Sequence, residues 1–301
     1  MIEISRDLYP FAEHWLELEP GVRMHYVDEG PRDGPVVLML HGNPTWSFYW
    51  RRLITALRTT HRVIAPDHIG CGKSDKPDDD RYGYRLERRI DDVERLVSEL
   101  DLRELTLIVH DWGGMIGLGW ADRQPERLAR LVLLNTAAFG LPDTKRMPPS
   151  LWLARNTGLG ALLVRGCNAF ARGATRLAVT RRPLAKDVRD ALIAPYDSWA
   201  NRRAVLRFVQ DIPLQPGDPG FEIITKVGER VGQFDDRPVL ICWGARDFVF
   251  DDHFLRVWEQ KLPHAEVHRF ADAGHYVLED AGAEIEVLVR RFLGVAERRG
   301  P

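Results

Sequence analysis

The sequence predicts an α/β protein with a mostly parallel, doubly wound β-sheet and one helical insertion. Two observations lead to this fold class. Short apolar runs alternate along the chain with segments of helical periodicity, which is the pattern of parallel strands joined by crossover helices. From about residue 140 to residue 231, strand-like runs are nearly absent, and the alternation then resumes. We therefore expect a sheet-based core, residues 1–139 and 232–301, and a helical cap, residues 140–231.

Composition describes an ordinary globular chain. Of its 301 residues, 45% are hydrophobic and 29% are charged, and the formal charge of −2 gives no reason to expect a nucleic-acid partner. The start of the chain lacks the apolar segment of a signal peptide, and no run approaches the roughly 20 apolar residues that span a bilayer. Three scattered cysteines, Cys71, Cys167 and Cys242, do not suit a disulfide framework or a zinc site. We expect a cytoplasmic protein with no metal and no cofactor.

The first hundred residues contain the elements expected of such a core. Residues 14–28 alternate as a strand pair does, and "VVLMLHG", 36–42, is a continuous apolar run, as expected for a central strand covered on both faces. The segment "YRLERRIDDVERLVSEL", 84–100, has the three-and-four spacing of an amphipathic helix. Two more elements are expected between these segments, a helix at 46–58 and a strand at 61–67.

The stretch "LTLIVHDWGGMIGLGWA", 105–121, predicts a strand that turns sharply into a helix. Its first half is apolar and β-branched, whereas its second half is small and apolar at helical spacing. Gly113 and Gly114 lie just past the junction. This is the layout of a nucleophile elbow, which lifts one side chain above the sheet. Most elbows have serine at the apex, but here the apex is Asp111.

The rest of the core again contains apolar runs typical of strands. We expect strands within "LARLVLLN", 128–135, "RPVLICWGARD", 237–247, and "AEVHRF", 265–270, and a closing helix at 281–299. Charge separates the insertion from the core. Residues 140–231 hold 15 Lys and Arg against 8 Asp and Glu, a charge of +7, and the remainder holds 27 against 36, a charge of −9. A docking face and an ordinary solvated surface both account for this asymmetry.

With these elements in place, nearly the whole chain resembles the α/β-hydrolase fold family. In that family the catalytic residues follow the order nucleophile, acid, histidine. The resemblance places the acid at Asp247, just after the strand "VLIC", and the histidine at His275 in "FADAGHYVLED". His41 and His110 flank strand ends and are expected to shape turns. The other histidines lack the matching context: His14, His25, His61, His68, His253, His264 and His268.

Nearby carboxylates and one amide exclude other positions for the acid. Some relatives carry the acid after the strand that precedes the insertion, but "LVLLNTAAFG" has Asn135 there. Asp251 and Asp252 suit the N-cap and the first turn of a following helix. Asp247 therefore stays as the expected acid.

An aspartate at the apex favours a particular chemistry. The side chain of Asp111 is ionised at neutral pH and needs no base, and the start of the following helix favours the anion. A carboxylate suits displacement at an sp3 carbon or the opening of a strained ring, which leaves an ester on the enzyme. His275, oriented by Asp247, would then activate a water molecule.

The residues around the apex narrow the resemblance. In haloalkane dehalogenases, an asparagine and the tryptophan after the nucleophile hold the departing halide, and Asn43 of "HGNP" and Trp112 match both. Their backbone N–H groups also suit an oxyanion hole. Epoxide hydrolases need two cap tyrosines, whereas the insertion holds only Tyr196. Fluoroacetate dehalogenases carry arginines just past the nucleophile, and "DWGGMIG" has none.

Within that group, the chain resembles the third subfamily of haloalkane dehalogenases, which overlaps with the β-lactone decarboxylases of bacterial long-chain olefin biosynthesis. The cap segments "RNTGLGALLVRGCNAFARGA" and "APYDSWANRRAVLRFVQDIPL" are similar to the decarboxylases. The resemblance implies opening of a cis-β-lactone with two alkyl chains, loss of carbon dioxide and a cis-alkene, and assembly with other enzymes of olefin synthesis. It leaves open whether attack falls on a ring carbon or on the carbonyl. The alternatives are a haloalkane dehalogenase and a non-catalytic interaction protein.

Overall fold

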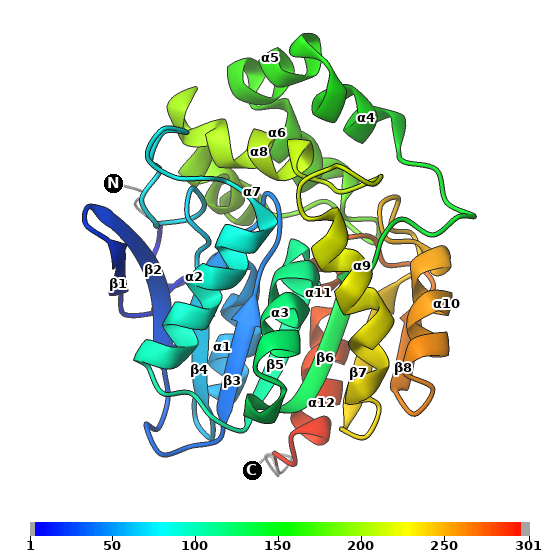
Figure 1. Ribbon diagram of the computed structural model, residues 1–301. Coiled ribbons are helices and arrows are strands. Elements are labelled where there is room, and N and C mark those ends of the chain that lie inside the picture. Colours follow the sequence, from blue (N-terminus) through cyan, green and yellow to red (C-terminus); the bar gives the residue numbers. More distant parts are fainter. Residues whose placement is uncertain (1–3, 296–301) are drawn as a thin grey trace.

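Eight strands form one sheet in this computed structural model, which describes residues 4–295 (Figure 1). Across the sheet the strand order is β1-β2-β4-β3-β5-β6-β7-β8. β1 pairs antiparallel with β2 and β2 with β4, whereas all other neighbouring strands are parallel. The strands span β1 His14–Glu19, β2 Val22–Glu29, β3 Val36–Leu40, β4 Arg62–Pro66, β5 Leu105–Asp111, β6 Leu128–Thr136, β7 Val239–Gly244 and β8 Glu266–Phe270.

Helices cover both faces of this sheet. The core helices are α1 Arg51–Leu57, α2 Leu86–Glu99, α3 Trp112–Arg123, α9 Phe221–Arg230, α10 Asp252–Lys261, α11 Val277–Asp280 and α12 Gly282–Phe292. Residues of α2, α3, α9 and α10 pack on one face, and residues of α1, α11 and α12 pack on the other. The expected α/β fold class, with a mostly parallel sheet, is confirmed.

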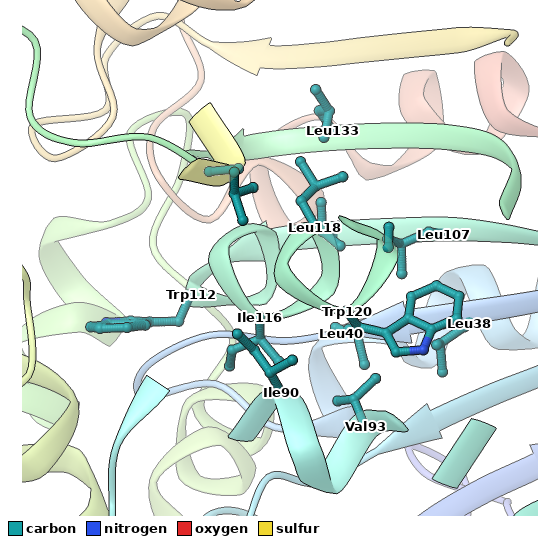
Figure 2. Close-up of a cluster of buried hydrophobic side chains, with 14 of the residues drawn as sticks. Leu38, Leu40, Ile90, Val93, Leu107, Trp112, Ile116, Leu118, Trp120 and Leu133 are labelled. Carbon is teal, nitrogen blue, oxygen red and sulfur yellow. The ribbon is translucent and has the colours of Figure 1, made fainter. Parts of the chain in front are cut away.

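Alternation along the central strands divides the core into two layers. In β5, Leu107 and Val109 face the layer that contains α3, whereas Ile108 faces the opposite layer. Because both faces are covered, every residue of β5 is buried, which explains the apolar run at 107–109. Figure 2 shows the first layer, with Ile116 and Trp120 of α3 placed among side chains of α2 and the strands. Trp112, at the start of α3, belongs to the same cluster and extends to one side of the other labelled side chains (Figure 2).

The insertion between β6 and β7 is helical, as expected. Its helices α4 to α8 lie above the sheet (Figure 1). They are α4 Pro149–Asn156, α5 Gly158–Cys167, α6 Ala169–Leu177, α7 Lys186–Ile193 and α8 Arg203–Gln210. The division into a core, 1–139 and 232–301, and a cap, 140–231, stays a prediction, and α9, within the last range, packs beside α3.

Most expected elements lie where the sequence predicted them. The expected helix at 46–58 consists of a 3-10 turn, Ser47–Trp50, followed by α1. The closing helix is shorter than predicted, because α12 ends at Phe292 and Gly294 adopts a φ of 70°. The last residues of that prediction, 296–299, lie outside the described residues. No helix within 4–295 is both long enough and apolar enough to cross a membrane.

Candidate active site

The junction of β5 and α3 is a sharp elbow with Asp111 at its apex. Asp111 adopts φ 52° and ψ −127°, a conformation that costs a non-glycine residue free energy and that clusters at functional sites. The turn leaves no room beside it, because a Cβ placed on Gly113 would lie 2.0 Å from the carbonyl oxygen of Leu40. The hydroxyl of Thr136 donates to the Asp111 carbonyl oxygen and ties the elbow to β6.

The two oxygens of the Asp111 carboxylate have different surroundings. Oδ1 accepts a hydrogen bond of 2.7 Å from the backbone N–H of Asn43, in the loop after β3. The backbone N–H of Trp112 also donates to this carboxylate. Oδ2 lies 3.5 Å from Nε2 of His275. One oxygen is thus fixed by the backbone, and the other is oriented toward the imidazole.

His275 lies between two carboxylates that come from distant parts of the chain. Its Nδ1 donates to Oδ2 of Asp247 over 2.7 Å. The other oxygen of Asp247 accepts a 2.7 Å hydrogen bond from the backbone N–H of Val249, which fixes the carboxylate in the turn after β7. The structure therefore brings together the three residues that were predicted to form the triad. All three are buried, and their catalytic roles remain predictions.

Burial and charge act on these groups in opposite directions. Burial raises the pKa of the Asp111 carboxyl, and the facing His275 and the N–H donors of Asn43 and Trp112 offset only part of that effect. The N-terminus of α3 therefore does not keep the pKa of Asp111 below its usual value. Burial alone would lower the pKa of His275, but the carboxylates of Asp247 and Asp111 outweigh it and raise the pKa. The two carboxylates therefore stabilise the imidazolium form of His275.

Asn43 and Trp112, the predicted leaving-group donors, differ in their hydrogen bonding. Nδ2 of Asn43 donates to the carbonyl oxygen of Val205 in α8 over 3.1 Å, which the sequence did not indicate. An amide nitrogen carries two hydrogens, so one remains for a ligand. The ring of Trp112 packs against Phe208 of α8. Within residues 4–295 its indole N–H has no hydrogen-bond partner, and Trp112 lines the cavity beside Asp111.

An apolar cavity of about 300 Å³ lies between the elbow and the insertion. Asn43, Asp111, Trp112 and His275 contribute its polar end. The remaining surface is almost entirely apolar and comes from both sides, including Met115, Phe139, Leu151, Leu163, Val164, Phe170, Val209, Phe250 and Phe254. Such a cavity suits a hydrophobic ligand with one polar group at its reacting centre.

His110 and Asn135 support the loops that carry His275 and Asp247, a role that the sequence did not indicate. His110 lies directly before Asp111, and its Nε2 is 2.8 Å from the carbonyl oxygen of His275. Burial lowers the pKa of His110 well below its usual value, so the ring is neutral and Nε2 is the donor. Asn135, at the alternative acid position, bonds both backbone groups of Gly244 at the end of β7. Its amide thereby supports the strand that leads to Asp247.

Asp280 links the insertion to the histidine loop. Its carboxylate accepts hydrogen bonds from the N–H groups of Gly274 at 2.8 Å, Thr180 at 2.9 Å and Arg181 at 3.1 Å. Two reciprocal bonds run beside it, since Tyr276 N–H donates to Ala178 and the hydroxyl of Thr180 donates to Asp272. A carboxylate inside the apolar run "YVLED" was the available signal in the sequence.

Other expectations for this region can be compared with the structure. Asp251 is the N-cap of α10, with its side chain accepting from the N–H of His253, and Asp252 lies in the first turn, as predicted. His41 shapes a turn, since its Nδ1 bonds the carbonyl oxygen of Gly42. Within the described residues, no group of three or more His, Cys, Asp and Glu could hold a metal ion.

Comparison with known proteins identifies the family. Residues 35–282 match the family model described as "alpha/beta hydrolase fold". The chain belongs to the alpha/beta hydrolase fold family. Within it, the chain is 54% identical to the cis-3-alkyl-4-alkyloxetan-2-one decarboxylase of Shewanella oneidensis, over 96% of this chain and 91% of that protein. Identity to the decarboxylase of the same name from Xanthomonas campestris is 48%, over 95% and 97% of the two chains.

Haloalkane dehalogenases of the same hydrolase family are also similar. The enzyme of Mycolicibacterium paratuberculosis is 36% identical, over 92% of this chain and 91% of that one. The crystal structure of haloalkane dehalogenase DatA from Agrobacterium tumefaciens C58 superposes with a TM-score of 0.82 at 26% identity, over 95% and 97% of the two chains. The resemblance predicted from the sequence, to dehalogenases and β-lactone decarboxylases, is confirmed.

Proposed function

We propose that this protein decarboxylates cis-3-alkyl-4-alkyloxetan-2-ones, the β-lactones named in its 54% identical relative, to alkenes. The observation that carries the proposal is the carboxylate of Asp111, with one oxygen held by the backbone and the other at the polar end of an apolar cavity. The apolar walls suit two alkyl chains, and the carboxylate suits a strained ring.

In the proposed reaction, Oδ2 of Asp111 attacks C4, the alkyl-bearing ring carbon that is bonded to the ring oxygen. A carbon–oxygen bond to Asp111 forms, the ring carbon–oxygen bond breaks, and its electron pair stays on the released carboxylate. The bond between that carboxylate and the chain then breaks, its electron pair forms the double bond, and Asp111 leaves as a carboxylate. Carbon dioxide and an alkene are released, and the enzyme is regenerated without water. Inversion on attack followed by anti departure converts a cis-lactone into a cis-alkene.

The neighbouring side chains have assigned roles in this proposal. The free N–H groups of Trp112 and Asn43 bind the carboxylate that the ring opening releases. His275, held by Asp247 at 2.7 Å, balances the charge of Asp111 in the buried site. In a haloalkane reaction the same pair would activate a water molecule that hydrolyses the alkyl ester on Asp111.

Haloalkane hydrolysis is the second candidate function. It is favoured by the Trp112 indole N–H at the cavity, the arrangement expected for a halide site, and by 36% identity to a haloalkane dehalogenase. The two reactions share the nucleophile and differ in how the intermediate decays. The first needs loss of carbon dioxide, and the second needs water.

A parallel assay tests the proposal. The purified protein is given a cis-dialkyl β-lactone, with alkene measured by gas chromatography, and separately 1-iodobutane, with acid and iodide release measured. We expect rapid alkene formation and slow iodide release. Asp111→Asn should abolish both, whereas Asp252→Asn, a surface control at the start of α10, should retain both. Rapid iodide release with no alkene would replace the proposal by the second candidate, and neither product would favour a non-catalytic protein.

Two further expectations belong with this proposal. We propose a cytoplasmic location, supported by the three free cysteines within the described residues. We also propose assembly with other enzymes of olefin synthesis, supported by the resemblance to β-lactone decarboxylases. Co-expression with those enzymes followed by size-exclusion chromatography tests the assembly, and elution at the size of the isolated protein would contradict it.

A further inference from the structure

The outer part of the cap has an unusual charge pattern. Residues 144–186, which include α4, α5 and α6, contain nine Lys and Arg and no Asp or Glu. Within the described part of the chain, five of these cations form no salt bridge: Arg146, Arg165, Arg172, Arg176 and Arg182. Helices α4 and α5 form the outermost layer of the cap, on the side away from the sheet (Figure 1). This surface is therefore positive without the mixed signs of an ordinary protein exterior.

The same helices expose large apolar side chains. Residues 4–295 contain eight exposed large hydrophobic side chains, and four of them lie in this segment. They are Trp152 at 54% exposure, Leu159 at 58%, Leu162 at 54% and Leu177 at 68%. Leu159 and Leu162 are three residues apart on α5 and so share one face. Single exposed hydrophobic residues are normal, but four of them within one short cationic segment indicate binding.

The opposite faces of these helices line the cavity of the candidate active site. Leu151 of α4, Leu163 of α5 and Phe170 of α6 all contribute to its wall. Leu177 lines the cavity and is also the most exposed of the group, and Phe248 is likewise both exposed and part of the wall. Residues that have both properties mark the opening. The cavity therefore opens beside the cationic and apolar surface.

We propose that the outer surface of residues 144–186, the cationic–apolar surface, binds an anionic lipid bilayer. Arginine with Trp and Leu on short helices is the composition of helices that lie in the headgroup region of a membrane. The lipid headgroups supply the negative charge that the segment itself lacks, at about a fivefold gain in partitioning for each Lys or Arg near the surface. Arg172 and Arg176, four residues apart on exposed α6 positions, are placed to contact those headgroups together.

The consequence for catalysis rests on the proposed function. A β-lactone with two alkyl chains partitions into a bilayer, and the opening at Leu177 would lie against that bilayer. The substrate would then enter the cavity from the lipid, and the alkene would return to it. The binding surface itself does not depend on which reaction the site performs.

Vesicle co-sedimentation tests the proposal with the full-length protein. The probes are vesicles of phosphatidylglycerol mixed with phosphatidylcholine and vesicles of phosphatidylcholine alone, at low and high salt. We expect binding to the anionic vesicles, weakened by salt, and little binding to the neutral ones. Arg172→Gln with Arg176→Gln should weaken partitioning about 30-fold. The matched control replaces two exposed arginines outside the cap, Arg95 and Arg256, with Gln and should bind as the wild type does.

A second variant tests the apolar part. Trp152→Ser with Leu159→Ser and Leu162→Ser alters none of the cavity residues, so decarboxylation of a short-chain lactone in solution should be unchanged while vesicle binding falls. Equal binding of wild type and variants, or no binding to anionic vesicles at low salt, would overturn the proposal. A shift of the oligomeric state in these variants without vesicle binding would assign the surface to a second copy, and binding of an acidic protein in its place would assign it to a protein partner. Absence of lactone activity with intact vesicle binding would refute only the function.

Discussion

Replacing Asp280 by asparagine tests whether the cap holds the histidine loop in position. The Asp280 carboxylate is surrounded by hydrogen-bond donors. Gly274 N–H and Thr180 N–H donate to Oδ2, and Arg181 N–H donates to Oδ1. Asparagine keeps one acceptor oxygen and turns the other position into an NH2 group that faces N–H donors. The substitution therefore removes hydrogen bonds on one side while leaving the size of the side chain unchanged.

The magnitude follows from the number of bonds lost. A hydrogen bond to a charged group is worth about 1.5–3 kcal/mol, and the amide loses at least one such bond and repels the donor it faces. We expect the free energy of unfolding to fall by about 3 kcal/mol. Gly274 directly precedes His275, so the imidazole loses part of its support. A displacement of about 1 Å at a catalytic group costs roughly 100-fold in rate, and we expect kcat to fall 10- to 100-fold with a smaller change in KM.

Denaturant unfolding and steady-state decarboxylation measure the two effects, with Asp236→Asn as an exposed control. The decisive comparison is made at a temperature at which the Asp280 variant is fully folded. If kcat of the folded variant equals that of the wild type, Asp280 is a structural residue alone and the argument for positioning His275 is refuted. If the unfolding free energy is also unchanged, the hydrogen bonds described above do not stabilise the loop.

Three other substitutions give distinct outcomes. His275→Phe should let an alkyl ester on Asp111 accumulate from 1-iodobutane, detected by intact mass. The lactone should be turned over more slowly, because Asp111 loses the charge of His275, but it should leave no ester, because its decay needs no water; an ester that accumulates from the lactone would contradict the water-free route. Burial raises the pKa of Asp92 to about 6 from an unfolded value of 3.8, so its stabilising contribution is complete below 3.8 and lost as pH rises through 6. Asp92→Asn should therefore raise stability by about 3 kcal/mol at pH 7.5 and by about half as much at pH 5, measured by thermal unfolding; an equal effect at both pH values would refute this. Arg51→Met breaks a buried bidentate pair with Glu279 at 2.6 and 2.9 Å and should lower the free energy of urea unfolding by about 3–5 kcal/mol. Adding Glu279→Leu in the same chain should recover a large part of that loss. A double variant no more stable than Arg51→Met would argue against charge burial as the cause.

The sequence by itself determined the local structure of the core. Leu107, Ile108 and Val109 are all buried and face the two layers in alternation, as expected for an apolar strand covered on both faces, and this pattern can be predicted from neighbouring residues alone. The elbow could be predicted for the same reason, since Gly113, two residues after Asp111, allows the close approach to Leu40. Both features depend on residues that are adjacent in the chain. Family resemblance then supplied His275 and Asp247, whose positions no local pattern defines.

Only the tertiary structure decided the distances and the supports of the site. Packing of elements 28 and 164 residues apart sets the contacts of His275 with Asp247 and Asp111. It also sets the bond from the Asn43 amide to α8, the net rise in the pKa of the Asp111 carboxyl, and the attachment of the cap through Asp280. These properties depend on burial and on partners far along the chain. The sequence encodes them only through the complete packing of core and cap.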